Sequence, residues 1–327
     1  MADLNIYTFD DYKDEYNKIF AGVYNDFKMR AASDYRFELS PLEYDDFINS
    51  VNSNLIKCII LFEQEIPTGF LSYTTLVTEA VELNIIHVIE GENTSQKRHA
   101  LLNRFLDEIE TVKGSKIISY PVLGVQSEIL PYLEKYDFQT VNQAVMSLKF
   151  DDIDRINSLS NKRLKPLNHG YKIENWNDKY LSDAVRIVHE AFKDMSDSKF
   201  DSRFLTINGT TDIILKITQG IYGEFLPKET KVLFYRDNVI GICFANMTNK
   251  YIANIPLVAV NKKYRGKSLG KYILRSVVTD ISKLVITGNS LLSEINASCD
   301  FDNKSAYNMY IGIGFTEAYT YKHAYKN

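Results

Sequence analysis

The chain has 327 residues, of which 45% are hydrophobic and 24% are charged, and it carries a formal net charge of −4 at pH 7. These values are ordinary for a globular protein of two domains, and the slightly acidic balance gives no reason to expect nucleic-acid binding. The sequence has no apolar run of about 18 residues, the length of a membrane span, and residues 1–6 lack the apolar core of a secretion signal. We therefore expect a cytoplasmic protein that binds neither nucleic acid nor a membrane.

Cysteine and histidine usage predicts neither a metal site nor a disulfide. Cys58, Cys243 and Cys299 form no CxxC pair, and the five histidines show no metal-ligand spacing. An odd, sparse cysteine count is typical of a reducing compartment.

The first half of the chain alternates strand and helix patterns. Apolar runs and period-two patterns predict strands at 58–62, 68–76 and 82–90, a helix at 95–112, a strand at 116–121, a helix at 126–136 and a strand that ends at 150. The polar segment Glu63-Gln64-Glu65 predicts a turn between the first two strands.

A polar segment then divides the chain. Residues 151–170 contain the run Asn157-Ser158-Leu159-Ser160-Asn161 and Pro166, and their charges change from acidic to basic. This composition predicts a linker at 151–170 between a first domain, 1–150, and a second domain, 171–327.

The second half repeats the element order of the first. Its patterns predict strands at 232–235, 239–247 and 251–260, a helix at 269–284, a strand at 290–299, a helix at 305–313 and a strand at 315–325. The repetition predicts two domains of the same fold.

The segment Arg265-Gly266-Lys267-Ser268-Leu269-Gly270 joins a predicted strand to a predicted helix. A helix N-terminus presents unpaired N–H groups and a partial positive charge, and glycine permits close approach of a ligand to the backbone. Arg265, Lys267 and Lys271 add positive charge at the same place. These features predict a site for the pyrophosphate of a nucleotide-like cofactor.

Gly266-Lys267-Ser268 also resembles the end of a P-loop, Gly-x-x-x-x-Gly-Lys-Ser/Thr. The first glycine of that motif would stand at position 261, which is occupied by Asn261, and its magnesium-binding acid would have to be Asp300. A P-loop enzyme is therefore the less favoured alternative.

A second motif follows the first at a suitable distance. Asn303, Ala306, Tyr310 and Gly314-Phe315 fit the pattern Asn-x-x-Ala-x-x-x-Tyr-x-x-x-Gly-Phe at every position. Together the two motifs resemble the acetyl-CoA site of the GNAT superfamily of N-acetyltransferases. The first motif departs from that family's pattern, Arg/Gln-x-x-Gly-x-Gly/Ala, at one position, where Ser268 replaces a glycine.

The resemblance implies that acetyl-CoA is a co-substrate and that no metal takes part. It implies cofactor contacts for Val258, Ala259, Val260, Arg265, Gly266, Lys267, Ser268, Leu269, Gly270, Lys271, Asn303, Ala306 and Tyr310. It also implies that the hydroxyl of Tyr310 protonates the departing sulfur, a role that suits a phenol within hydrogen-bond reach. For the base we expect Glu294, with Asp194, Asp197, Asp201 and Glu224 as alternatives.

The first half resembles an eroded copy of the second. At a constant spacing of 177 residues, the second motif is replaced by Gln126, Ile129, Leu133, Asp137 and Phe138. The segment Thr94 to His99, read as the corresponding phosphate loop, has no glycine. The arrangement resembles tandem GNAT proteins of the mycothiol-synthase type, which implies an α/β (α+β) fold of two GNAT-like domains, each a mixed, mostly antiparallel sheet flanked by helices.

The acceptor pocket is expected in the second domain. Residues 192–204 interleave Phe192, Phe200 and Phe204 with acidic residues, and Tyr319 and Tyr321 could form an opposite wall. Acidic and aromatic groups favour a cationic amine, although the same composition is common in solvated loops. We expect acetyl transfer to a small amine or an amino-acid-like acceptor, with a non-catalytic acyl-CoA sensor or scaffold as the alternative.

Overall fold

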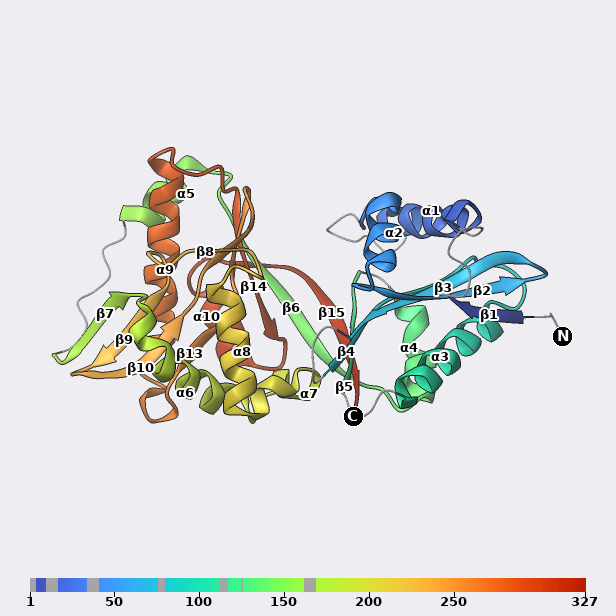
Figure 1. Ribbon diagram of the computed structural model, residues 1–327. Coiled ribbons are helices and arrows are strands. Elements are labelled where there is room, and N and C mark those ends of the chain that lie inside the picture. The colour runs from blue at the N-terminus through green and yellow to red at the C-terminus, as the bar shows by residue number, and fades with distance from the viewer. Residues whose placement is uncertain are drawn as a thin grey trace. The chain divides into compact units, whose positions relative to one another are not determined.

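The computed structural model describes residues 4–9, 17–33, 41–75, 80–111, 117–124, 126–161 and 169–327. The chain forms two compact units, coloured from blue to red along the chain in Figure 1. The first unit comprises residues 1–141 and 321–327, and the second comprises residues 142–320. Within the described residues, no helix combines the length and the apolar composition that a membrane crossing requires.

The first unit is a mostly antiparallel sheet between two sets of helices. Its strands pair in the order β1 (Leu4–Thr8), β2 (Lys57–Glu63), β3 (Ile66–Thr74), β4 (Ala80–Val88), β5 (Ile117–Val122) and the end of β15 (Thr316–Lys326), and only the β4–β5 pair is parallel. Its helices are α1 (Asn17–Ser33), α2 (Tyr44–Asn52), α3 (Thr94–Thr111) and α4 (Leu130–Lys135), with a short 3-10 turn at Ser127–Ile129.

The apolar run in β2 illustrates why this sheet is covered on both faces. Ile59 and Leu61 belong to a core cluster with α3, whereas Cys58, Ile60 and Phe62 belong to a second cluster with α1 and α2. Successive strand residues point to opposite faces, so a run without polar residues needs apolar cover on each side.

The second unit contains two groups of strands. One group is the antiparallel series β7 (Tyr171–Asn175), β9 (Lys231–Tyr235), β10 (Asn238–Cys243) and β13 (Val258–Val260). The other holds β8 (Glu224–Phe225), β11 (Asn246–Asn249), β12 (Ile252–Ile255), β14 (Glu294–Asp300) and residues 143–149 of β6 (Gln139–Lys149), with β12 and β14 parallel. The predicted fold class, a mixed and mostly antiparallel sheet with flanking helices in each half, is confirmed.

Helices again cover both faces of the second unit's sheet. Val232 and Phe234 pack in a cluster with α6 (Leu181–Phe192) and α8 (Ile207–Thr218). Leu233, between them, packs in a cluster with α9 (Leu269–Ile286) and α10 (Lys304–Ile311). The short elements α7 (Asp197–Phe200) and the 3-10 turn Ser202–Leu205 connect α6 to α8.

Two strands that the sequence predicts as continuous are divided. The predicted strand 251–260 is β12 and β13, and the predicted strand 239–247 is β10 and β11. Pro256 follows β12 and lacks the N–H that a continued ladder requires. β12 therefore pairs with β14, while β13 pairs with β10.

The segment expected to be a linker begins with a helix. α5 (Ile153–Asn161) is rich in serine and asparagine, but Ile156 and Leu159 lie three residues apart on one side of it. Ile156 is buried, and Leu159 packs against the core that contains α9. The hydroxyl of Thr279 on α9 donates a hydrogen bond to the carbonyl of Leu159 at 3.2 Å. Residues 162–168 of the expected linker, and the expected element ends at 76, 112 and 116, lie outside the described residues.

The units also differ from the ranges read from sequence. β6 lies within the expected first domain, 1–150, but it crosses the boundary of the units at residue 141, and its residues 143–149 pair with β14 in the second unit. The last residues of β15 pair with β5 and belong to the first unit. The sequence patterns did not predict helices α1, α2, α6 and α8, which the structure contains.

Candidate functional site

A cavity of about 690 Å³ lies within the second unit. Its walls come from β13 with the residues before it, the loop and first turn of α9, the end of β14, α10, and the segment around α7. Every cofactor residue predicted from sequence lines this cavity except Lys267, whose ammonium lies 5.7 Å from the centre of the Tyr264 ring. Residues of the motif at 265–270 and of the motif at 303–315 therefore line the same cavity.

The strand β13 presents one unpaired edge to this region. It is the last strand of its group, and its ends are bonded to β10 through the carbonyl of Leu257 and the N–H of Asn261. Antiparallel ladders bond alternate residues, so the peptide groups of Ala259 face β10. Those of Val258 and Val260 point to the opposite, unpaired side.

The N-terminus of α9 offers free donors to the same cavity. Leu269, Gly270 and Lys271 form the first turn, and among the described residues none accepts a hydrogen bond from their N–H groups. Intrahelical bonding begins with Tyr272, whose N–H donates to the carbonyl of Ser268 at 3.0 Å. Helix α9 runs for 18 residues, so its dipole adds positive potential at this end.

Cations accompany these donors. Arg265 and Lys271 line the cavity, and the Nε of Arg265 donates to the carbonyl of Val260 at 3.1 Å. This bond ties the loop before α9 to the end of β13. Asn261, where a P-loop would begin with glycine, instead accepts a hydrogen bond from the N–H of Lys263 at 3.0 Å and starts a 3-10 turn.

The loop takes a backbone conformation that favours glycine at two positions. Gly266 has φ of 79° and Ser268 has φ of 58°. The family's glycine at the position of Ser268 therefore matches a left-handed conformation in this chain, which a serine side chain disfavours. The Ser268 side chain makes no capping hydrogen bond that would offset this cost.

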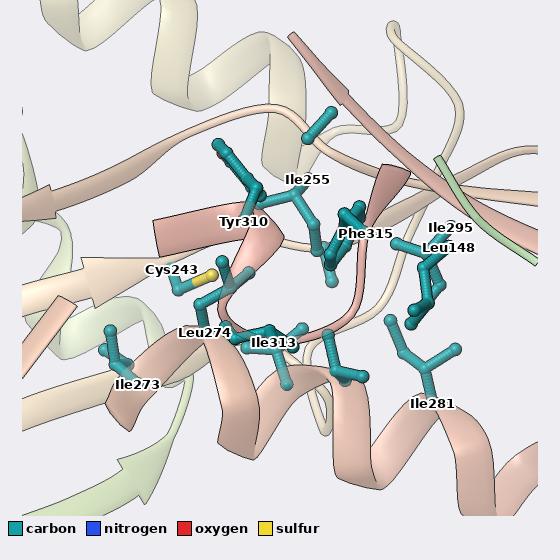
Figure 2. Close-up of a cluster of buried hydrophobic side chains, with 14 of the residues drawn as sticks. Leu148, Cys243, Ile255, Ile273, Leu274, Ile281, Ile295, Tyr310, Ile313 and Phe315 are labelled. Atoms are coloured by element: carbon teal, nitrogen blue, oxygen red, sulfur yellow. The ribbon is translucent and has the colours of Figure 1, made fainter. Parts of the chain in front are cut away.

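Helix α10 places Tyr310 in the core beside the cavity. Asn303 caps the helix by accepting a hydrogen bond from the N–H of Ala306 at 3.1 Å. The side chain of Tyr310 is 2% exposed and packs edge-on against Phe315, with 5.3 Å between ring centres. Figure 2 shows Tyr310 on its helix among the labelled core residues Cys243 and Ile255.

The hydroxyl of Tyr310 is available to a ligand. Tyr310 lines the cavity, and among the described residues no group bonds to its hydroxyl. Burial raises the pKa of Tyr310 well above its ordinary value of 10, and Cys243, Cys299 and Asp197 add to the shift. The phenol thus stays protonated across the physiological range and can donate its proton.

Two carboxylates line another part of the cavity wall. Asp197 belongs to α7 and Asp300 ends β14. Burial raises the pKa of Asp197 from 3.8 to about 6, and the charges of Asp300 and Asp201 add to the shift. Asp300 accepts hydrogen bonds from the hydroxyl of Ser196 and, at 2.8 Å, from the N–H of Asp302.

The structure separates Glu294 from this site. Glu294 begins β14, six residues and about 20 Å along the strand from Asp300, and it does not line the cavity. Its carboxylate accepts hydrogen bonds from Ser147 at 3.0 Å and Asn296 at 3.2 Å. The period-two pattern that suggested a strand residue near the cofactor could not say which end of the strand meets the cavity.

Only one of the alternative bases lies in the cavity wall. Asp197 lines it, whereas Asp194 and Glu224 are exposed and Asp201 pairs with Arg203 at 2.7 Å. Phe192 and Phe204 also line the cavity, as expected, and their rings stack with 4.8 Å between centres. The cavity lining does not include Phe200, Tyr319 or Tyr321.

Sequence reasoning did not assign Met195, Ser298, Cys299 or Asp300 to an acceptor site, although all of them line the cavity. The sequence held one indication for Ser298, Cys299 and Asp300. They end a predicted strand shortly before Asn303, so they were candidates for the same site.

The corresponding part of the first unit is built differently. Residues 94–99, expected to form a loop, are the first turns of α3. There the buried Lys97 pairs with Glu63 at 2.7 Å, and Arg98 pairs with Glu90 at 2.9 Å. Carboxylates of the unit itself therefore engage the cations that a phosphate would need.

The second motif of the first unit keeps its turn and loses the tyrosine hydroxyl. Asp137 has φ of 63°, and Gly314, its counterpart, has φ of 121°. Leu133, which replaces Tyr310, is completely buried, and Gln126 donates its amide to the carbonyl of Leu123 at 2.8 Å.

Comparison with known proteins identifies the fold. Neither a protein-family model nor a curated protein matches the sequence. A GCN5-related N-acetyltransferase from Sphaerobacter thermophilus is similar in structure, with a TM-score of 0.64 at 11% identity, over 99% of this chain and 95% of that one. A tandem GNAT protein from the clavulanic acid biosynthesis pathway gives a TM-score of 0.60 at 12% identity, over 99% and 98% of the two chains.

A third similar structure is a GCN5-related glucosamine N-acetyltransferase region of a fungal multi-domain GH3 β-N-acetylglucosaminidase. Its TM-score is 0.62 at 11% identity, over 100% of this chain and 38% of that one. This chain therefore has the tandem GNAT fold that its two motifs predict.

We expect that Ser268→Gly stabilises the second unit by about 0.5–1 kcal/mol, because glycine adopts a positive φ without the cost that serine incurs. Denaturant unfolding of the full chain measures this change. Ser268→Ala is the control, since it removes the same hydroxyl and keeps the strain. Equal stabilisation by both variants would show that the backbone is not the cause.

Proposed function

We propose that the second unit transfers an acetyl group from acetyl-CoA to the amine of a small acceptor. The observation that carries this proposal is one cavity that contains the free N–H groups at the start of α9, the buried hydroxyl of Tyr310 and the carboxylate of Asp197. The similarity to proteins named N-acetyltransferases supports the same reaction class.

In this proposal the start of α9 would hold the pyrophosphate of acetyl-CoA. Its free N–H groups, Arg265 and Lys271 provide the donors and the positive charge that phosphates require. The peptide groups of Val258 and the N–H of Val260, on the unpaired edge of β13, would bond to the amides of the pantetheine arm, as an added strand does at a sheet edge.

Asp197 would act as the base in place of Glu294. The acceptor ammonium gives a proton to the Asp197 carboxylate, and the lone pair left on nitrogen forms a bond to the acetyl carbon. The resulting oxyanion is stabilised by a backbone N–H of β13. The carbon–sulfur bond then breaks with its electron pair on sulfur, which takes a proton from Tyr310.

The acetylated nitrogen then transfers its remaining extra proton to the Tyr310 phenolate, which becomes neutral again. The proton on Asp197 passes to solvent, so the products are an amide, the free thiol of CoA and one proton. The test is a thiol-release assay with the full chain and a panel of amines. Binding of acetyl-CoA without release of thiol for any amine would favour the non-catalytic acyl-CoA sensor.

Gly270→Val is expected to weaken acetyl-CoA binding tenfold or more. A Cβ on Gly270 would lie 3.2 Å from the Sδ of Met309 and 3.8 Å from Val260, so the branched side chain occupies the gap between β13 and α10. Isothermal titration measures the affinity and should give one site per chain for the unmodified protein.

The control for this change is Gly22→Val, another helix glycine, with open space around its Cβ. It should leave the affinity for acetyl-CoA unchanged. Unaltered binding in Gly270→Val, or two sites per chain, would contradict the placement of acetyl-CoA at α9.

Tyr310→Phe is expected to lower kcat by roughly 100-fold, the usual contribution of a positioned general acid. The ring packing against Phe315 is retained, so acetyl-CoA affinity and unfolding free energy should change little. Steady-state kinetics and thermal unfolding of the same preparation separate the two effects. Turnover at the unmodified rate would assign sulfur protonation to another donor.

The pH dependence of the reaction should reflect Asp197. Its carboxylate must be ionised to accept a proton, and its pKa lies at about 6. The titratable groups that face it are Asp201, Asp300, Cys299 and Tyr310. We expect kcat/KM to rise with pH through about 6, and Asp197→Asn to lower kcat by at least roughly 100-fold and remove that rise.

Stability supplies the control for Asp197→Asn. Because folding raises this pKa from 3.8 to about 6, ionisation of Asp197 lowers the free energy of unfolding as the pH rises through that interval. The Asn variant should therefore be at least as stable as the unmodified protein at pH 7. Lost activity together with lost stability would indicate a structural role instead.

A further inference from the structure

Charges are divided between two parts of the cavity wall. The lining cations, Arg265 and Lys271, both belong to the loop and first turn of α9. The lining carboxylates, Asp197 and Asp300, belong to α7 and the end of β14. The part of the wall assigned to the acceptor is therefore anionic.

Asp300 is the second carboxylate of this part of the wall. It accepts hydrogen bonds from the Ser196 hydroxyl and the N–H of Asp302. The nearby cation Lys304 donates instead to the carbonyl of Phe301 at 2.9 Å and lies 3.9 Å from that ring's centre. No lining cation of the cavity belongs to α7 or β14.

Apolar side chains line the cavity close to Asp197 in the chain. The stacked rings of Phe192 and Phe204 belong to this wall together with Met195. They can bury the methylene groups of an acceptor, which favours its binding.

Tyr310 adds a polar group, without a protein partner in the part of the chain that the structure describes, to the same cavity wall. The side chain of Tyr310 is 2% exposed, and among the described residues nothing pairs with its hydroxyl, which belongs to a residue of the same cavity wall. A phenol hydroxyl that is reached from the cavity can donate a hydrogen bond to a polar group of a ligand.

We propose that the acceptor is an aliphatic diamine, in which one amine reacts at Asp197 and Tyr310 while a second ammonium pairs with Asp300 across a methylene spacer. This inference rests on the proposed function. Asp300 is then a specificity residue and has no part in the proton transfers. A diamine pairs an ammonium with its carboxylate, whereas an acceptor with a single amine offers no such partner.

Acceptors of matched length test the proposal. The second group is an ammonium in 1,4-diaminobutane, a methyl in pentylamine and a carboxylate in 5-aminopentanoate. Thiol release by the full chain with acetyl-CoA gives kcat/KM for each, and diamines of three to six methylenes define the spacer. We expect the best diamine to exceed pentylamine by about tenfold to a hundredfold, the range for a charge-assisted pair, and 5-aminopentanoate to be the poorest.

The variant Asp300→Asn should reduce the ratio of diamine to monoamine kcat/KM by about the same factor. Asp302→Asn makes the same change of charge two residues away, on an exposed side chain outside the cavity lining, and should keep the ratio. Calorimetric titration of the protein saturated with CoA by 1,4-diaminobutane gives a second readout, and Asp300→Asn should weaken that binding.

The outcomes separate this inference from the proposed function. If kcat/KM for pentylamine or 5-aminopentanoate equals or exceeds that for every diamine, the diamine assignment is overturned and acetyl transfer is retained. The same conclusion follows if Asp300→Asn leaves the ratio of diamine to monoamine kcat/KM unchanged. Failure of every amine to release thiol, with acetyl-CoA still bound, would overturn the acetyl-transfer proposal and the diamine acceptor with it.

Discussion

The loss of pairing with β14 at Pro256 is the constraint on which the candidate site depends. β12 pairs with β11 on one edge and with β14 on the other, whereas β13, which follows Pro256, pairs among the described strands with β10 alone. A proline has no N–H to donate to a ladder, which favours the end of the strand at Ile255. β14 therefore lies beside β12 but not beside β13. The edge of β13 is left without a partner, and the cavity is lined by β13, the end of β14 and the starts of α9 and α10.

Electrostatics then distinguish the parts of that cavity. The helix N-terminus, Arg265 and Lys271 make one part suitable for an anion, and Asp197 and Asp300 make another suitable for a cation. Tyr310 belongs to the same wall, and burial keeps it neutral, because a phenolate in an apolar core is strongly disfavoured. The raised pKa of Asp197 has the same origin, which explains why a carboxylate there can exchange protons near neutral pH.

The first unit shows which parts of this design belong to the fold and which to the site. It keeps the left-handed turn after the last helix, with Asp137 in place of Gly314, and it keeps the buried aromatic Phe138. Its cations at the start of α3 are paired with Glu63 and Glu90, so the unit neutralises its own anion-binding groups. Buried cations require partners, and here the protein provides them.

Local sequence was enough to locate the helices and strands that carry the two motifs of the second unit and most residues of one cavity wall. The helix from Leu269, the cap at Asn303 and the phenol of Tyr310 depend on short spacings along one chain segment, and the structure places all three where the motifs predict. Tertiary structure decided the rest. The strand divided at Pro256 keeps β14 as a neighbour only before the proline, and Leu159 belongs to a helix rather than a linker because the core around α9 offers an apolar surface. The choice of carboxylates in the cavity wall has the same reason. Asp197 lines the cavity with Tyr310, and Glu294 does not, because the segment before α7 packs against the end of β14 through the bond of Ser196 to Asp300. These two residues are 104 positions apart, a contact that no local pattern encodes.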